Sequence, residues 1–250
     1  MLTQTTAFSI AFIIFGIVLL IWGLISFRVK RLIENIPTSK MRSIAMGLVE
    51  IYGEVVPSKD NILKSPFTNK DCVYYKYSIQ ELRSSGKNTY WATVDQGEEH
   101  RVFYLKDETG SVLVDPTGAK IETPVDNKID SRWGHDPPQV AKDFLAKRNI
   151  KWEGFLFGIN KTMKYIESFI APGDKLYIMG TADDNPYVKD ASTEKSVEDI
   201  MITKGKFEKF YYISDKREDA VLFKFKAKTY GGIISGSILI IISLIVLTWF

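Results

Sequence analysis

Both ends of this 250-residue chain are long apolar stretches without a charged side chain. The C-terminal stretch, Thr229–Phe250, follows Lys224, Lys226 and Lys228 and is dominated by Ile, Leu, Val and Gly. An α-helix of about 20 apolar residues crosses the hydrocarbon core of a bilayer. Thr229–Phe250 is therefore predicted to span a membrane, and we expect the residues before it to work beside that membrane, with no module after it.

The N-terminal stretch has the same character, because no charged residue precedes Arg28. Ala7–Phe27 is predicted to be a second membrane span. A cleaved signal peptide is the alternative, but it requires basic residues before its apolar core and small residues at its cleavage site. No Lys or Arg precedes this apolar run, and bulky Trp22, Leu24 and Ile25 occupy its end. We therefore expect a retained anchor.

Basic residues near the two spans all lie on the side of the segment between them, and the outer tails carry none. The positive-inside rule therefore predicts an integral membrane protein with a cytoplasmic domain and both termini outside. These side chains either set the topology alone or also contact anionic lipid headgroups. The candidates for headgroup contact are Arg28, Lys30, Arg31, Lys224, Lys226 and Lys228.

Small residues recur along both predicted spans. Ser9, Gly16 and Gly23 are spaced by seven residues and so share one helix face, and Gly232 and Gly236 form a GxxxG pattern. Small residues let helix backbones approach closely in lipid. The pattern predicts packing through these five residues, either within one chain or in a homodimer. The alternative is that glycine is simply common in membrane helices.

The polar middle of the chain is predicted to be rich in strands. Leu48–Val56 alternates apolar and polar residues with a period of two. Tight turns separate further strands, which are predicted at Cys72–Leu82, Thr89–Val94, Val102–Lys106, Ser111–Val114, Met163–Ile170, Lys175–Thr181 and Lys206–Ile213. Pro172-Gly173-Asp174 is expected to close a hairpin between two of them.

Two short helices and two irregular segments complete the prediction. A helix is expected from Thr38 or Ser39 to Met46, and another after Asp136, with Val140, Phe144 and Leu145 on one face. Irregular segments are expected at Thr123–Asp136 and Ala182–Val197.

The fold class that follows is an α+β membrane protein, in which two transmembrane helices enclose one β-rich domain with one or two helices. The β-rich domain is expected to be a small barrel or curled sheet similar to an oligonucleotide-binding (OB) fold. The predicted boundaries are spans at 7–27 and 229–250, juxtamembrane helical segments at 28–47 and 214–228, and the β-rich domain at 48–213.

Side chains that carry chemistry are scarce. The chain has one cysteine, Cys72, and two histidines, His100 and His135. A structural zinc takes four Cys or His ligands, so we expect no metal and no cofactor. Cys72 lies in a predicted strand and reads as a small core residue rather than a nucleophile. Lys and Arg total 33 against 30 Asp and Glu, a balance that argues against nucleic acid.

Three groups of residues resemble the GIDE, or beside-a-membrane (BAM), domain family. They are Met46-Gly47-Leu48-Val49-Glu50-Ile51-Tyr52-Gly53; Leu63-Lys64-Ser65-Pro66-Phe67 with Asp71-Cys72-Val73-Tyr74-Tyr75-Lys76-Tyr77; and Asp107-Glu108-Thr109-Gly110, Val112-Leu113-Val114-Asp115-Pro116, Pro172-Gly173-Asp174 and Gly180-Thr181-Ala182. Their order and the flanking spans extend the resemblance over most of residues 36–228.

The best-known members of that family are mitochondrial membrane E3 ubiquitin ligases, with a cytosolic RING after the second span. This sequence ends at Phe250, so it resembles short prokaryotic relatives without the RING, and a prokaryotic cell membrane is the expected location. The leading hypothesis is a non-catalytic membrane-tethered binding or scaffold module for an unknown protein partner or the lipid bilayer. The alternatives are a ligase acting with separate transfer proteins, and a binder of single-stranded nucleic acid through the tyrosine-rich strand.

Overall fold

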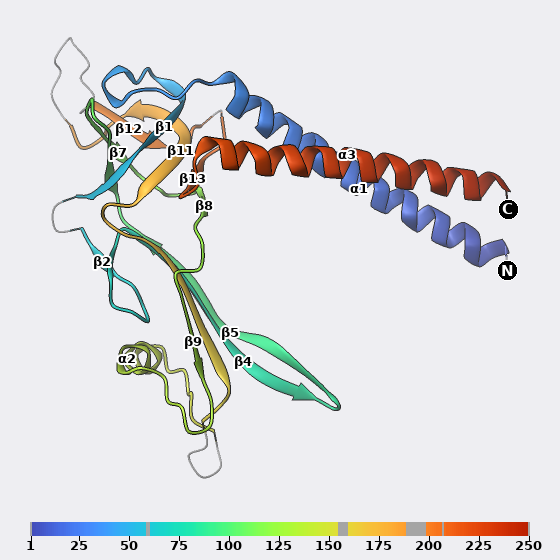
Figure 1. The fold of residues 1–250 in the computed structure, drawn as a ribbon, viewed down its shortest axis with the longest axis horizontal. Coiled ribbons are helices and arrows are strands. Elements are labelled where there is room, and N and C mark those ends of the chain that lie inside the picture. Colours follow the sequence, from blue (N-terminus) through green and yellow to red (C-terminus); the bar gives the residue numbers. More distant parts are fainter. Residues whose placement is uncertain (1, 59–60, 155–159, 189–198, 207, 250) are drawn as a thin grey trace. The chain divides into compact units, whose positions relative to one another are not determined.

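The structure is a computed structural model that describes residues 2–58, 61–154, 160–188, 199–206 and 208–249. The chain divides into two compact units. One unit joins the two ends of the chain, Met1–Thr38 and Lys216–Phe250, and the other is the middle, Ser39–Asp215. Figure 1 shows the helices of the first unit and the strands of the second.

The terminal unit is a pair of long helices, α1 (Leu2–Asn35) and α3 (Glu218–Trp249). At 1.5 Å per residue, their 34 and 32 residues extend for about 50 Å, which exceeds the roughly 30 Å of the hydrocarbon core. Both helices are long and apolar enough to span a membrane. Each continues without a break from its apolar part into the predicted juxtamembrane segment, and α1 ends two residues before Pro37.

The segment after α1 differs from the prediction. The helix expected from Thr38 or Ser39 to Met46 is a single 3-10 turn, η1 (Met41–Ser43). No side chain caps it at Lys40. A side chain on the turn at residues 107–110 holds it instead, since the backbone N–H of Met41 donates to Asp107 Oδ2 at 3.1 Å. A tertiary contact therefore replaces the local helix.

The middle unit is built on a closed five-stranded barrel. Its strands are β1 (Gly47–Pro57), β6 (Phe103–Lys106), β7 (Ser111–Val114), β11 (Lys175–Asp184) and β12 (Ile200–Thr203). β1 pairs with both β6 and β11, and the other pairs are β6–β7, β7–β12 and β12–β11, which closes the ring. In chain order the ring reads 1-2-3-5-4-1 with one parallel pair, β7–β12, and this confirms the OB-like expectation.

The barrel closes because alternate residues on its strands are apolar and point inward. On β1 these are Val49, Ile51 and Val55, which belong to the first hydrophobic core. Glu50, on the opposite face of β1, is also fully buried, and its carboxylate accepts a hydrogen bond from the Tyr177 hydroxyl at 2.7 Å. The simple alternation of β1 predicted an exposed Glu50, whereas a partner on the neighbouring strand β11 makes its burial tolerable.

Two short strands extend the barrel along the second edge of β11. They are β13 (Tyr212–Ser214), which pairs with β11, and β8 (Lys120–Glu122), which pairs in parallel with β13. The edge of β11 opposite β1 is thus shared between β12 and β13.

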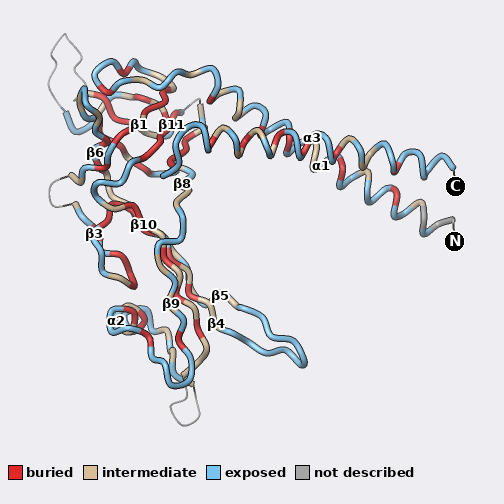
Figure 2. The backbone as a smooth tube through the Cα atoms, viewed as in Figure 1, coloured by how far each residue is buried: buried red, intermediate tan, exposed pale blue. Residues whose placement is uncertain are grey.

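Residues inserted between the barrel strands form a second sheet. It has the order β5-β4-β10-β9 and contains β4 (Tyr74–Ser85), β5 (Asn88–His100), β9 (Asn127–Ser131) and β10 (Met163–Ile170). Helix α2 (Gln139–Lys147) and the hairpin of β2 (Leu63–Lys64) and β3 (Asp71–Cys72) pack on one side of it. This second core includes Phe67, Tyr77, Tyr165 and Leu145. Figure 2 shows buried segments in both the barrel and this sheet.

Pro172-Gly173-Asp174 does not close a hairpin. The strands that it joins, β10 and β11, match the predicted ranges closely but belong to different sheets, since β10 pairs with β4 and β9 while β11 pairs with β1. Gly173 has a φ of 89°, which favours glycine, and its N–H donates to Val55 O on β1. The turn therefore passes the chain from the second sheet into the barrel.

Other expectations also differ from the structure. Cys72 lies in the two-residue strand β3, one residue before β4. The two segments expected to be irregular contain β9 and the end of β11. The predicted strand at Lys206–Ile213 is reduced to β13. The barrel strand β12 was not predicted. On α2, Val140 is exposed and Ala141 is buried with Leu145. Residues 189–197 of the predicted loop, and Phe207, lie outside the described residues.

Candidate functional site

The five small residues predicted to pack between the spans are all buried. A Cβ added to Gly23 would lie 2.7 Å from the backbone N of Ile233, and one added to Gly236 would lie 2.7 Å from Gly16 O. Real Cβ atoms do not come within 3.0 Å of other heavy atoms, so glycine at these positions is what allows the backbones of α1 and α3 to lie this close together. Gly231, one residue before Gly232, would meet nothing within 4 Å. In this structure, the glycine face of each helix contacts the other helix of the same chain.

The six basic residues proposed for lipid headgroups lie at one end of this helix pair. Lys30 and Lys226 both approach Glu34, with N–O distances of 3.4 and 3.8 Å. Lys228 Nζ lies 5.9 Å from the ring centroid of Trp22, and Lys30 Nζ lies 5.8 Å from that of Tyr230. Arg28 and Arg31 are exposed, and Lys224 is half-buried. The contacts thus cross from one helix to the other.

The residues considered for chemistry do not come together as a catalytic site. Cys72 is fully buried, and its Sγ lies 3.7 Å from Leu63 O. Burial raises the pKa of the Cys72 thiol to about 12, and the nearby carboxylate of Glu167 adds to the effect. His135 exchanges two backbone hydrogen bonds with Arg132 in a turn, and His100 Nε2 lies 3.1 Å from Thr117 Oγ1. Within the described residues, no group of three or more His, Cys, Asp or Glu is arranged to hold a metal ion.

The acidic residues of the GIDE-like motifs hold turns. Asp107 Oδ1 accepts hydrogen bonds from the backbone N–H groups of Thr109 and Gly110 and from the Thr109 hydroxyl. Burial alone would raise the pKa of Asp107, but these hydrogen bonds and that from Met41 outweigh it and lower the pKa. Asp115 Oδ1 accepts from Thr117 N and Oγ1 in the same way. These carboxylates therefore have a structural role.

The tyrosines of β4 form a ladder with the carboxylates of β5. Tyr74, Tyr75 and Tyr77 are buried, and their hydroxyls donate to Glu98, Glu99 and Asp95 at 2.9, 2.7 and 3.0 Å. Burial, followed by these hydrogen bonds, raises the pKa of all three tyrosines, that of Tyr77 to about 12. Bases of a nucleic acid stack on exposed aromatic rings, so these buried rings give no support to a nucleic-acid site.

A second carboxylate fixes the motif Ser65-Pro66-Phe67 to the sheet. Glu167 on β10 is fully buried, and it accepts hydrogen bonds from Phe67 N at 2.8 Å and from Asn127 Nδ2 at 3.4 Å. The Phe67 ring then packs edge-on against Tyr77, Phe144 and Tyr165. Sequence reasoning missed Glu167 because it occupies an ordinary alternating strand, and no local signal marks its burial.

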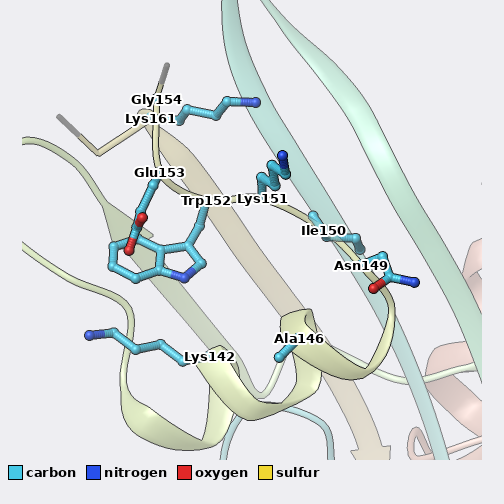
Figure 3. A pocket seen from close by; sticks show the side chains of 9 residues that line it. All are labelled: Lys142, Ala146, Asn149, Ile150, Lys151, Trp152, Glu153, Gly154 and Lys161. Atoms are coloured by element: carbon cyan, nitrogen blue, oxygen red, sulfur yellow. The ribbon is translucent and has the colours of Figure 1, made fainter. Parts of the chain in front are cut away.

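A pocket of about 720 Å³ opens between α2 and the segment that follows it. Figure 3 shows its side chains, with Lys142 and Ala146 on the helix and Trp152 facing Lys142. Lys142 Nζ lies 4.7 Å from the indole centroid and 2.6 Å from Asp136 Oδ2, while Lys161 pairs with Glu81 at 3.2 Å. Lys151, which also lines the pocket, is exposed and has no ion pair within the described residues.

This pocket was not predicted. Trp152–Phe157 has no clear periodicity, and part of that segment lies outside the described residues. A lysine-rich rim around an indole suits a negatively charged group: three lysines and one glutamate, Glu153, line the pocket. Lys142 and Lys161 already have carboxylate partners, so Lys151 is the lysine of this pocket best placed to meet a further acidic group.

Comparison of the sequence with known protein families identifies the family of this chain. The sequence model of the GIDE family, described as E3 ubiquitin ligase, matches residues 74–248, which include β4, most of the barrel and α3. No curated protein and no solved structure matches the chain. The family is membrane-associated, in agreement with two helices long enough to span a bilayer. With more than half of its length matched, this chain belongs to the GIDE family and is a module related to E3 ubiquitin ligases.

Proposed function

We propose that this chain is a non-catalytic, membrane-anchored binding module, in which the second sheet and α2 hold a protein partner beside the bilayer. The observation that carries the proposal is the pocket around Trp152, a concave surface with an aromatic ring and lysines, which are features typical of a binding site. Its charge favours an acidic group of the partner, such as a carboxylate side chain.

The cysteine and the two histidines give little support to covalent catalysis. A thiol that accepts ubiquitin must form a thiolate and be reached by its partner. Cys72 is fully buried and has a raised pKa. His135 forms backbone hydrogen bonds with Arg132 in a turn, and His100 contacts the hydroxyl of Thr117.

A charge reversal in the pocket tests the binding role. The full-length chain is purified in detergent from its host and its bound proteins are identified by mass spectrometry, alongside Lys151→Glu and Lys147→Glu variants. Lys147 is an exposed lysine of α2 that does not line this pocket. We expect Lys151→Glu to lose at least one partner that the wild type and Lys147→Glu retain. Identical partners for all three proteins would contradict the pocket as the binding site.

The family match favours one alternative, a ligase that acts together with separate transfer proteins. We therefore add the purified chain to activating and conjugating enzymes and measure transfer of ubiquitin or a ubiquitin-like protein. The proposal predicts no stimulation, and no stoichiometric zinc by elemental analysis. Transfer that is abolished by Cys72→Ala, or a zinc ion bound at one per chain, would overturn the non-catalytic reading.

A further inference from the structure

The second sheet has two different faces. On one face, Tyr75, Tyr77 and Ile79 of β4 belong to the second core, which α2 covers through Leu145. Side chains alternate between the faces of a strand, so the residues between these point away from α2. Antiparallel sheets commonly leave one such face open to the surroundings. No described helix of the middle unit packs on it.

We call this second side the open face. The pairing registers bring its residues together across all four strands, since Gln80 pairs with Lys164, Ile166 pairs with Lys128, and Leu82 pairs with Trp91. Its principal side chains are Lys76, Leu82, Trp91, Lys128, Lys164 and Ile166. Leu82 and Trp91 are each 37% exposed, so two large apolar side chains sit at the surface.

The distal part of the open face is a two-stranded ribbon. β10 pairs with β4 only as far as Glu81, and the backbone N–H of Leu82 donates to Thr162 O at 2.9 Å, so only the residues beyond Leu82 pair with β5 alone. Figure 2 shows this ribbon as exposed over its whole distal length. An isolated two-stranded ribbon is only marginally stable in water, and Trp91 is stabilised here by Lys164, whose Nζ lies 3.6 Å from the ring centroid.

The charges of the open face are mainly positive. Lys76, Lys128 and Lys164 are opposed by the carboxylates of Glu98 and Asp130, and Glu98 already accepts the hydroxyl of Tyr74. Toward the ribbon tip, the sequence from Leu82 to Val94 contains Arg83 and Lys87 and no acidic residue, and Arg83 pairs with Glu81 at 3.2 Å. The open face thus has a small excess of positive charge, with Lys164 directly on the exposed Trp91.

We propose that the open face rests on an anionic lipid bilayer, with Trp91 at headgroup depth and the lysines on lipid phosphates. Tryptophan and basic side chains concentrate at membrane interfaces, and each lysine near an anionic surface strengthens binding by about fivefold. The two candidate spans tether the domain that carries this face to a bilayer. The outer edge of β5 has no strand partner among the described residues, so the face must stop at the hydrated headgroups, where unpaired backbone groups remain satisfied.

The test compares two faces of the same domain in the full-length chain. A nitroxide spin label is attached at Leu82→Cys on the open face or at Val140→Cys on α2, and the chain is reconstituted into vesicles. The native positions are 37% and 38% exposed, so the pair is matched. Wild-type protein serves as the blank, because Cys72 is fully buried. Accessibility is measured to oxygen, which enters lipid, and to a water-soluble nickel chelate.

In vesicles of mixed phosphatidylglycerol and phosphatidylcholine, we expect the Leu82→Cys label to be open to oxygen and several-fold less accessible to the nickel chelate than the Val140→Cys label. Lys76→Gln combined with Lys128→Gln, or vesicles of phosphatidylcholine alone, should reduce this difference. Equal chelate accessibility of the two labels would overturn the proposal. Protection of the Leu82→Cys label from both reagents would also overturn it, because it would indicate cover by protein.

Brominated lipids provide a second measurement without a spin label. Lipids brominated near the top of the acyl chain quench tryptophan fluorescence at the membrane interface, so quenching that is lost in Trp91→Phe would place Trp91 there. Unchanged quenching in that variant, which leaves Trp22 and Trp249 of the spans intact, would contradict the proposal. Failure here leaves the partner-binding proposal standing, since that proposal depends on the opposite side of the sheet.

Discussion

Gly232 of α3 lies directly against Gly23 of α1: a Cβ added to Gly232 would be 2.8 Å from the Cα of Gly23. The contact repeats two turns away, where a Cβ on Gly16 would be 2.8 Å from Ile240 Cγ1. Close backbone approach replaces hydrophobic burial as the source of helix association in lipid.

The first prediction follows from this contact. Gly232→Leu should destabilise the helix pair by about 1–3 kcal/mol, because the added side chain has no room. Gly231→Leu is the matched control and should have little effect, since nothing lies within 4 Å of its Cβ position. Thermal unfolding followed by circular dichroism in detergent measures the packing, and the unfolding temperature should fall only with Gly232→Leu. An unfolding temperature that rises with protein concentration would instead indicate a homodimer through the spans.

The second prediction concerns Cys72. Because burial raises its pKa to about 12, the folded chain should not react with thiol reagents at pH 8, and unfolding should expose one reactive thiol per chain. The raised pKa also gives a pH dependence: stability is present below the unfolded-state value of about 9 and is lost as the pH rises toward 12. In Cys72→Ala, the free energy of unfolding should no longer fall for this reason as the pH rises toward 12. Rapid labelling of the folded wild type at pH 8 would refute the prediction.

The third prediction concerns Glu167. Glu167→Ala leaves the buried N–H of Phe67 without its acceptor, so it should reduce the free energy of unfolding by about 1–3 kcal/mol. Glu167→Gln keeps an oxygen acceptor and should cost less. Glu54→Ala, at an exposed position of β1, is the control. Urea unfolding followed by circular dichroism in detergent measures the differences in stability. Equal stability of Glu167→Ala and wild type would argue against a stabilising role for the Glu167–Phe67 hydrogen bond.

The fourth prediction uses the lowered pKa of Asp107. A carboxylate whose pKa is lower in the folded state contributes stability above its unfolded value, about 3.8, and loses that contribution as the pH falls through the folded value. Asp107→Ala should therefore be destabilised by about 1–2 kcal/mol at pH 7, and its deficit should disappear in stronger acid. Asp130→Ala, at an exposed position of β9, is the control and should change stability little at pH 7. A deficit independent of pH would mean that packing, and not the carboxylate, is responsible.

The fifth prediction concerns topology. Basic residues beside both spans predict a cytoplasmic domain, so Asn160-Lys161-Thr162 should not be glycosylated in microsomes. Asn160 Nδ2 donates to Asp136 Oδ1 at 2.6 Å, which would hinder modification even on the lumenal side. Tyr90→Thr therefore adds a second acceptor, Asn88, at the exposed ribbon tip. Glycosylation at either asparagine would place the domain outside the cytoplasm.

The sequence alone determined the spans and most of the regular strands. Uncharged stretches can only be stable across a bilayer or in a core. Alternation of apolar and polar residues marks Leu48–Val56, and the turn residues Asp107-Glu108-Thr109-Gly110 mark the strand at Ser111–Val114, without reference to the rest of the chain. The fold of a membrane-anchored OB-like domain, and the resemblance to the GIDE family, were accessible for the same reason.

The tertiary structure decided which strands pair and which polar groups are buried. The turn at Pro172-Gly173-Asp174 has the local chemistry of a hairpin, yet its strands enter different sheets, since β11 pairs with β1 and β10 pairs with β4. Glu50 and Glu167 sit at ordinary strand positions, and only distant partners, Tyr177 and Phe67, make their burial stable. The open face likewise exists only after strands far apart in sequence pair. Local patterns encode local structure, whereas pairing and burial depend on the whole chain.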